Sequence, residues 1–103
     1  MHTTIEHYCL TGAADENGEA VMEVPAPASR SGTIVNVGGW AAEGIAPDDG
    51  KQVPPYSHTA HNPLTGTYIY TGDDGYSHAK LIFSGVRQSA FVTVYAYSVI
   101  NWW

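Results

Sequence analysis

The sequence predicts an all-β fold, an antiparallel β-sandwich or jelly-roll-like barrel of about six to eight short strands in one domain over residues 1–103. Short segments rich in β-branched and aromatic residues recur along the chain, and several of them alternate polar with apolar positions. Glycine and proline separate these segments. The best helical candidate, residues 39–45, is interrupted by Gly44 and Pro47 after barely one turn.

Six segments carry strand signals, and two tight turns connect neighbouring pairs of them. Asn17-Gly18 and Asp74-Gly75 favour hairpin turns, because both residue types in each pair tolerate the positive φ that matches the twist of paired strands. The turns therefore predict pairing of the first strand with the second, and of the fourth with the fifth. The predicted strands are residues 4–10, 19–24, 33–40, 67–71, 77–84 and 91–101.

A long loop is predicted over residues 41–63. It contains four prolines and the sequence Asp48-Asp49-Gly50, none of which suits the interior of a strand. Loops of this length are usually functional or held by a partner. Pro25 and Pro27 end the second strand in a similar way.

The last predicted strand carries apolar side chains on both faces. Alternate residues of a strand point to opposite faces, and a surface strand of a small sheet protein usually has only one apolar row. The protein's own core can cover one row, so we expect a neighbouring subunit or a ligand to cover the other. The first row consists of Val92, Val94, Ala96, Ile100 and Trp102, and the second of Phe91, Tyr95, Tyr97, Val99 and Trp103.

Charge and composition argue against several classes of protein. The net charge is −6, and no two of the four basic residues are adjacent. Proteins that bind a phosphate backbone need clustered cations, so we expect no nucleic-acid partner. The acidic balance and the short apolar runs argue against a membrane partner. The first residues lack the basic start and apolar stretch of a signal peptide, so we expect the chain to be made in the cytoplasm.

No motif for catalysis or for metal binding is complete. His58 and His61 lie three residues apart in the predicted loop, but no spacing supplies the further ligands of a zinc site. The Asp-Gly turns lack the ligand spacing of a calcium loop; an ion shared by two or three turn tips that meet at one end of a sandwich is the alternative. Cys9, the only cysteine, is expected to be a small buried hydrophobic residue. The sequence thus predicts that the protein is not an enzyme and has no cofactor or metal.

Aromatic residues are the strongest candidates for binding. Those of the last strand are expected to contact protein subunits of the same or a larger assembly, and the simplest such assembly is a homo-oligomer. A second set suits stacking against sugar rings, as in carbohydrate-binding modules, so a glycan is the alternative partner. The predicted interface residues are Tyr95, Tyr97, Trp102 and Trp103, and the stacking residues are Trp40, Tyr56, Tyr68 and Tyr70.

In organisation the chain resembles the small β-sandwich accessory proteins of tailed-phage virions, such as capsid decoration, head-fibre and tail-tip subunits. The resemblance rests on the Asn17-Gly18 hairpin, on Pro25 and Pro27, on the loop over residues 41–63 and on the aromatic terminal strand. It covers the whole chain and gives no residue a catalytic or binding role. It implies a structural or attachment protein that is associated with a virion and acts as an oligomer or as a bound subunit.

Overall fold

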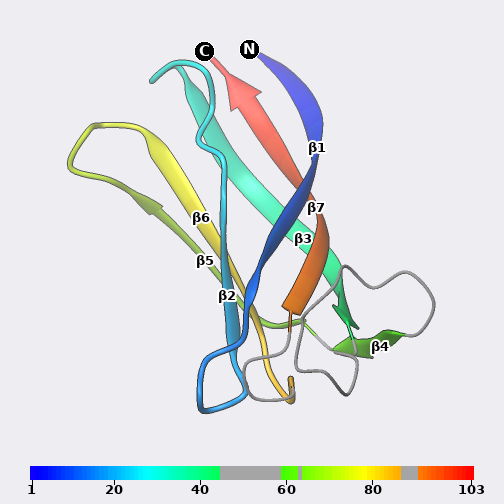
Figure 1. Ribbon diagram of the computed structural model, residues 1–103. Helices are drawn as coiled ribbons and strands as arrows, with labels where there is room; N and C mark the ends of the chain where they lie inside the picture. Colours follow the sequence, from blue (N-terminus) through cyan, green and yellow to red (C-terminus); the bar gives the residue numbers. More distant parts are fainter. Residues whose placement is uncertain (45–58, 63, 87–90) are drawn as a thin grey trace.

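The computed structural model describes residues 1–44, 59–62, 64–86 and 91–103, and these residues confirm the all-β antiparallel prediction (Figure 1). None of them is helical. They form a four-stranded sheet in the order β1-β7-β3-β4 and a three-stranded sheet in the order β2-β6-β5. The strands are β1 (His2–Ala13), β2 (Ala20–Val24), β3 (Gly32–Gly44), β4 (Thr59–Asn62), β5 (Leu64–Thr71), β6 (Ser77–Phe83) and β7 (Phe91–Trp102).

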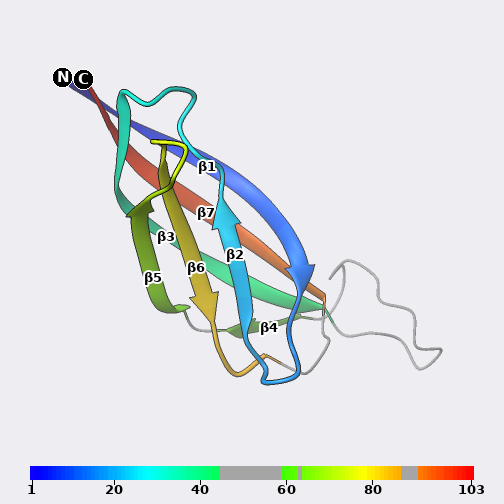
Figure 2. The same cartoon turned by 90° about the vertical axis from the view of Figure 1, so that its left-hand side faces the viewer.

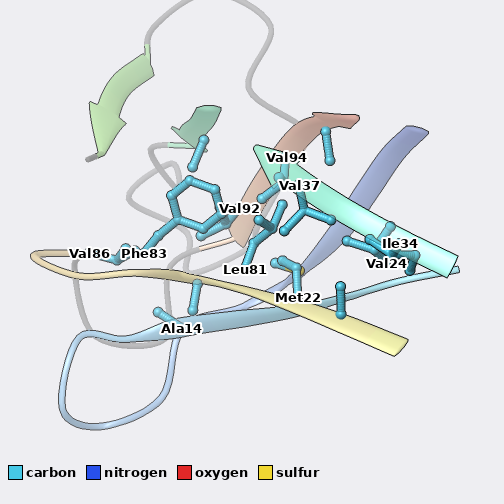
Figure 3. Close-up of a cluster of buried hydrophobic side chains, with 14 of the residues drawn as sticks. Ala14, Met22, Val24, Ile34, Val37, Leu81, Phe83, Val86, Val92 and Val94 are labelled. Carbon is cyan, nitrogen blue, oxygen red and sulfur yellow. The ribbon is translucent and has the colours of Figure 1, made fainter. Parts of the chain in front are cut away.

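The two sheets pack face to face in a sandwich-like arrangement (Figure 2). Strand β6 alternates buried and half-buried residues along its whole length, as expected for a strand with one face on the core. The core lies between the sheets and draws on both of them (Figure 3). Its largest members are at most 2% exposed and include Phe83, Leu81, Ile34, Val92 and Val94.

Strand β7 lies between β1 and β3, and its first row faces the core. Val92, Val94 and Ile100 are fully buried. Ser98 is a fully buried polar residue in the same row, and its Oγ lies 3.2 Å from the Tyr8 hydroxyl. Because the Tyr8 hydroxyl donates to Glu6 Oε2 at 2.8 Å, the Ser98 hydroxyl is the donor to Tyr8. Burial raises the pKa of Tyr8, and the hydrogen bond from Ser98 opposes this shift.

The predicted pairing of the first strand with the second is wrong. Strand β1 pairs with β7 over all its 12 residues, from His2 opposite Trp102 to Ala13 opposite Phe91. A turn is present at Asn17-Gly18, where Gly18 has a φ of 77°. However, it leads the chain from one sheet to the other, since β1 and β2 belong to different sheets. The prediction for Asp74-Gly75 is confirmed, because β5 and β6 form a hairpin and Gly75 has a φ of 81°.

The predicted loop over residues 41–63 is too long at both ends. Residues 41–44 continue β3, in which residues 41–43 pair with β7, and residues 59–62 form β4 against the end of β3. The Ala-Ala-Glu-Gly sequence of residues 41–44 has weak strand propensity, so pairing with β7 rather than local preference makes it a strand. Residues 45–58, which include Tyr56 and His58, lie outside the described residues.

Candidate functional site

Exposed apolar side chains from three strands gather on the face of the four-stranded sheet that points away from the core. The pairing register places Ile5 opposite Val99 across β1 and β7, and Trp40 opposite Tyr95 across β3 and β7. Ile5 is 60% exposed, Trp40 48% and Tyr95 46%. We call this group the outer aromatic face; its members are Ile5, Val35, Trp40, Tyr95, Tyr97 and Val99.

The rings of the outer aromatic face lie close together over β3. Trp40 stacks on Tyr95 with ring centroids 4.7 Å apart and planes 30° from parallel. The Tyr97 ring lies directly over Gly38, where a Cβ atom would stand 2.5 Å from the Tyr97 hydroxyl oxygen. Glycine within a strand marks such close approaches, so Gly38-Gly39 is the signal in the sequence that points to this site.

A shallow pocket of about 610 Å³ lies at these rings. Its lining combines residues of the outward rows with four residues that belong to the core or pack against it, Tyr8, Val37, Leu64 and Ala96. His7 stands opposite Tyr97 on β1 and adds an imidazole to the rim. The pocket is lined by His7, Tyr8, Val37, Gly38, Gly39, Trp40, Leu64, Tyr95, Ala96 and Tyr97.

This face is free of full charges although the chain is acidic. Within residues 2–13 of β1, 32–42 of β3 and 92–102 of β7, the one residue with a full charge is Glu6, and the register pairs it with Ser98 in the buried row of β7. The outward rows over these residues therefore hold no Asp, Glu, Lys or Arg. The net charge of −6 is carried elsewhere on the molecule. An uncharged aromatic surface of this kind is suited to burial against a partner.

The four predicted interface residues occupy three different environments. Tyr95 and Tyr97 belong to the outer aromatic face. Trp102 is half-buried against the core, and its Nε1 donates to Thr4 Oγ1 at 2.8 Å. Trp103 is 77% exposed, although its backbone N–H donates to the Ser31 carbonyl at 3.1 Å. The first row of β7 thus faces the core between the two sheets, whereas Tyr95 and Trp103 of the second row are exposed to solvent.

The predicted stacking residues do not form one surface. Tyr68 and Tyr70 share a face of β5, as expected, with ring centroids 5.2 Å apart. That face is the outward side of the three-stranded sheet, whereas Trp40 lies on the other sheet beside Tyr95. The Tyr70 ring also stacks on His78 and donates its hydroxyl to Glu23 Oε1 at 3.2 Å. Desolvation and this hydrogen bond raise the pKa of Tyr70.

Beside these tyrosines, the β5–β6 turn holds an ion pair. His78 Nε2 lies 3.0 Å from both carboxylate oxygens of Asp74. The Tyr76 N–H donates to the same carboxylate at 2.9 Å. The hydrogen bonds from His78 and then Tyr76 lower the pKa of Asp74. The pair links Asp74 in the tip of the hairpin to His78, the second residue of β6.

The effect of this pair on stability should depend on pH. Because the folded-state pKa of Asp74 is lowered, its carboxylate contributes stability that is present above the unfolded value of about 3.9 and lost as pH falls through the folded value. We therefore expect Asp74→Asn to lower the denaturation midpoint at pH 7 and to leave it nearly unchanged at pH 2. Asp73→Asn, at the neighbouring exposed residue, is the control. An equal loss at both pH values would contradict this role of the carboxylate.

The remaining candidates from the sequence give no assembled site. Cys9 is exposed, so the expectation of a buried cysteine is wrong; the residue lies on the outward row of β1, opposite Tyr95. His61 lies on β4, and its predicted companion His58 is outside the described residues. Among the residues with described positions, no group of three or more His, Cys, Asp and Glu side chains is placed to hold a metal ion. The described part also contains no helix able to cross a membrane.

Comparisons with models of known protein families, with curated proteins and with solved structures found no match to this chain.

Proposed function

We propose that this protein is a structural or attachment subunit of a larger assembly, without enzymatic activity, comparable to the accessory proteins of tailed-phage virions. The observation that carries this proposal is the outer aromatic face. Trp40 and Tyr95 stack on each other at one end of it and are each about half exposed. An aromatic side chain presents about 150–250 Å² of surface, so each leaves roughly 100 Å² to a partner.

The composition of the face supports burial against protein. Trp and Tyr are enriched at interfaces and dominate their binding energy, whereas Lys, Glu and Asp are depleted from interface centres. The outward rows of β1, β7 and β3 follow that pattern. Contiguous apolar patches are uncommon on monomeric proteins unless they bind something.

The rings are also held in place before a partner arrives. Trp40 and Tyr95 stack on each other, and Tyr97 is seated over Gly38. Side chains that are already fixed lose little conformational entropy on binding, so more of their buried area contributes to affinity. A preformed platform on a rigid sheet is what a subunit that docks onto a repeating surface requires.

The test is self-association of the purified protein, followed by light scattering from micromolar to millimolar concentration. We expect the wild-type protein to form oligomers. Trp40→Ala and Tyr95→Ala should each raise the dissociation constant for association through this face about 30-fold or more, because aromatic anchors of an interface contribute about 2 kcal/mol or more. Tyr68→Ala is the matched control, since Tyr68 is 59% exposed on the other sheet. A wild-type protein that remains monomeric, or a Trp40→Ala variant that associates normally, would contradict the proposal.

The pocket supports a second candidate, a carbohydrate-binding module. Stacked aromatic rings beside hydroxyl groups and an imidazole suit a pyranose ring, which has an apolar face and polar edges. The platform in that case is Trp40 with Tyr95 and Tyr97, rather than Trp40 with Tyr68 and Tyr70.

The same variants test this candidate with a different measurement. Titration with hexamers of β-1,4-linked glucose and N-acetylglucosamine should change the tryptophan fluorescence of the wild-type protein and of Tyr68→Ala. The change should be lost in Trp40→Ala. Binding that depends on Tyr68 and survives loss of Trp40 would place a sugar site on the other sheet and contradict the assignment to this pocket.

A further inference from the structure

The two sheets have four edge strands among the described residues, and three of them carry features that limit pairing with another chain. Strand β4 has only four residues. Strand β2 has five and is followed by Pro25. Strand β5 contains a register irregularity between Leu64 and Gly66. Short strands, prolines and bulges are the usual protections of a sheet edge.

Strand β1 has none of these protections. It runs for 12 residues and pairs with β7 without a register shift. It contains no proline, lysine or arginine. Every second residue of such a strand directs its N–H and C=O groups away from its neighbour, so one side of β1 presents a row of unpaired donors and acceptors. The strand order places β1 at the margin of the four-stranded sheet, with β7 as its one neighbour in that sheet among the described strands.

We infer that β1 pairs with β1 of a second copy of this chain, antiparallel across a two-fold axis, and joins two four-stranded sheets into one. The inference concerns the edge of the sheet and does not depend on the function proposed for its face. An axis perpendicular to the sheet keeps the outward rows of both copies on the same side. The outer aromatic faces of the two copies would then form one continuous surface.

The side chains of β1 are self-complementary in this arrangement. Outward residues meet outward residues, so the 60% exposed Ile5 and the exposed Cys9 gain neighbours from the uncharged outward row of the other copy's β1. The described β1 carries one acid, Glu6, whose side chain accepts a hydrogen bond from Tyr8 in its own protomer. Only the register with Glu6 opposite Glu6 brings like charges face to face. Of the other acids among the described residues, Glu23 lies on β2 and Asp74 in the β5–β6 turn, whereas Asp15 and Glu16 follow the end of β1.

The length of the strand is sufficient for a stable pair. Twelve residues at about 3.3 Å each give a seam of roughly 40 Å. Antiparallel pairing along it forms about ten backbone hydrogen bonds, which is the number found in a typical protein interface. A foreign strand would gain the same hydrogen bonds, but a second copy also matches both rows of side chains by symmetry.

The experiment measures mass and amide hydrogen exchange of the full chain with reducing agent present, so that Cys9 forms no intermolecular disulfide. We expect a dimer whose formation slows exchange at alternate amides of β1, while exchange in edge strand β5 is unchanged. The double variant Ile5→Lys with Cys9→Lys should raise the dimer dissociation constant about tenfold or more, because the two-fold axis duplicates each like-charge contact. Val21→Lys, at a 52% exposed residue of β2, is the control.

Three results would overturn the inference: a wild-type protein that is monomeric at millimolar concentration, a dimer that the double lysine variant forms as readily as the wild type, and a dimer whose β1 amides still exchange rapidly. If the lysine variant fails to fold, amide exchange in the wild-type protein still decides the question. Ile5 also belongs to the outer aromatic face, so Trp40→Ala and the amide exchange of β1 separate this edge from that face. Trp40→Ala should weaken association beyond the dimer and leave the β1 dimer intact, since Trp40 lies on β3, which β7 separates from β1.

Discussion

Replacing Phe83 with alanine should lower the free energy of unfolding by about 3–5 kcal/mol. Phe83 is fully buried at the end of β6, between Ala20 of β2 and Leu64 of β5 in the three-stranded sheet (Figure 3). Removing its ring loses apolar burial and leaves a cavity that β-strands paired on both sides cannot close. The loss is a large part of the total stability of about 5–15 kcal/mol expected of a small domain.

Chemical denaturation followed by circular dichroism measures this effect. Val21→Ala is the control, because Val21 is 52% exposed on the neighbouring strand β2 and leaves no buried cavity. If Phe83→Ala is too unstable to purify, Phe83→Leu retains most of the volume and should show a smaller loss in the same direction. A change below about 1 kcal/mol for the alanine variant would mean that Phe83 is not part of a packed core.

The second large effect is expected at Gly18. Both Gly18 and Gly75 have positive φ, which costs an alanine about 1–2 kcal/mol. At Gly18 a Cβ atom would also stand 2.7 Å from the Val86 carbonyl oxygen, and the Val86 N–H donates to the Gly18 carbonyl at 2.9 Å. Relief of that contact requires a backbone shift. We therefore expect Gly18→Ala to lose about 2–4 kcal/mol, the sum of strain and overpacking.

Gly75→Ala is the matched control, because Gly75 also has a positive φ but makes no close contact with another backbone segment. Its Cβ atom would meet only the flexible side chain of Arg30, at 3.2 Å. The two variants, compared by chemical denaturation, should therefore differ in midpoint, with Gly18→Ala the less stable. Equal losses would mean that the approach of Val86 to Gly18 has no energetic effect.

Local patterns predicted the parts of the fold that depend on neighbouring residues. Period-two alternation identified β6 and the buried row of β7, since each side chain of a strand is placed by its own position. The Asp74-Gly75 pair identified the β5–β6 hairpin because its turn conformation is nearly independent of the rest of the chain. The second apolar row of β7 also indicated the exposed surface that became the outer aromatic face.

The features of the fold that the sequence did not predict depend on pairing between strands that are distant in the sequence. Strand β1 pairs with β7 and not with β2. The Asn17-Gly18 turn carries no information about this pairing, because the residues of β7 lie some ninety positions from their partners in β1. Residues 41–44 became strand through contacts with β7 and β4. Strand pairing also places the predicted stacking residues on two different sheets. Trp40 meets Tyr95 only because β3 pairs with β7, whereas Tyr68 and Tyr70 are carried by the other sheet.

The pairing of β1 with β7 sets the order of events during synthesis of the chain. His2 finds its partner only when Trp102 has been made, so the four-stranded sheet cannot close on the ribosome before its last strand emerges. Translation proceeds at about 5–20 residues per second, so roughly 5–20 s pass between the synthesis of β1 and the synthesis of β7. During that interval β1 is unpaired on both of its edges, and nascent chains on neighbouring ribosomes carry the same strand. Slow translation of the residues between β1 and β7 should therefore increase aggregation more than the same delay within the first residues of β1.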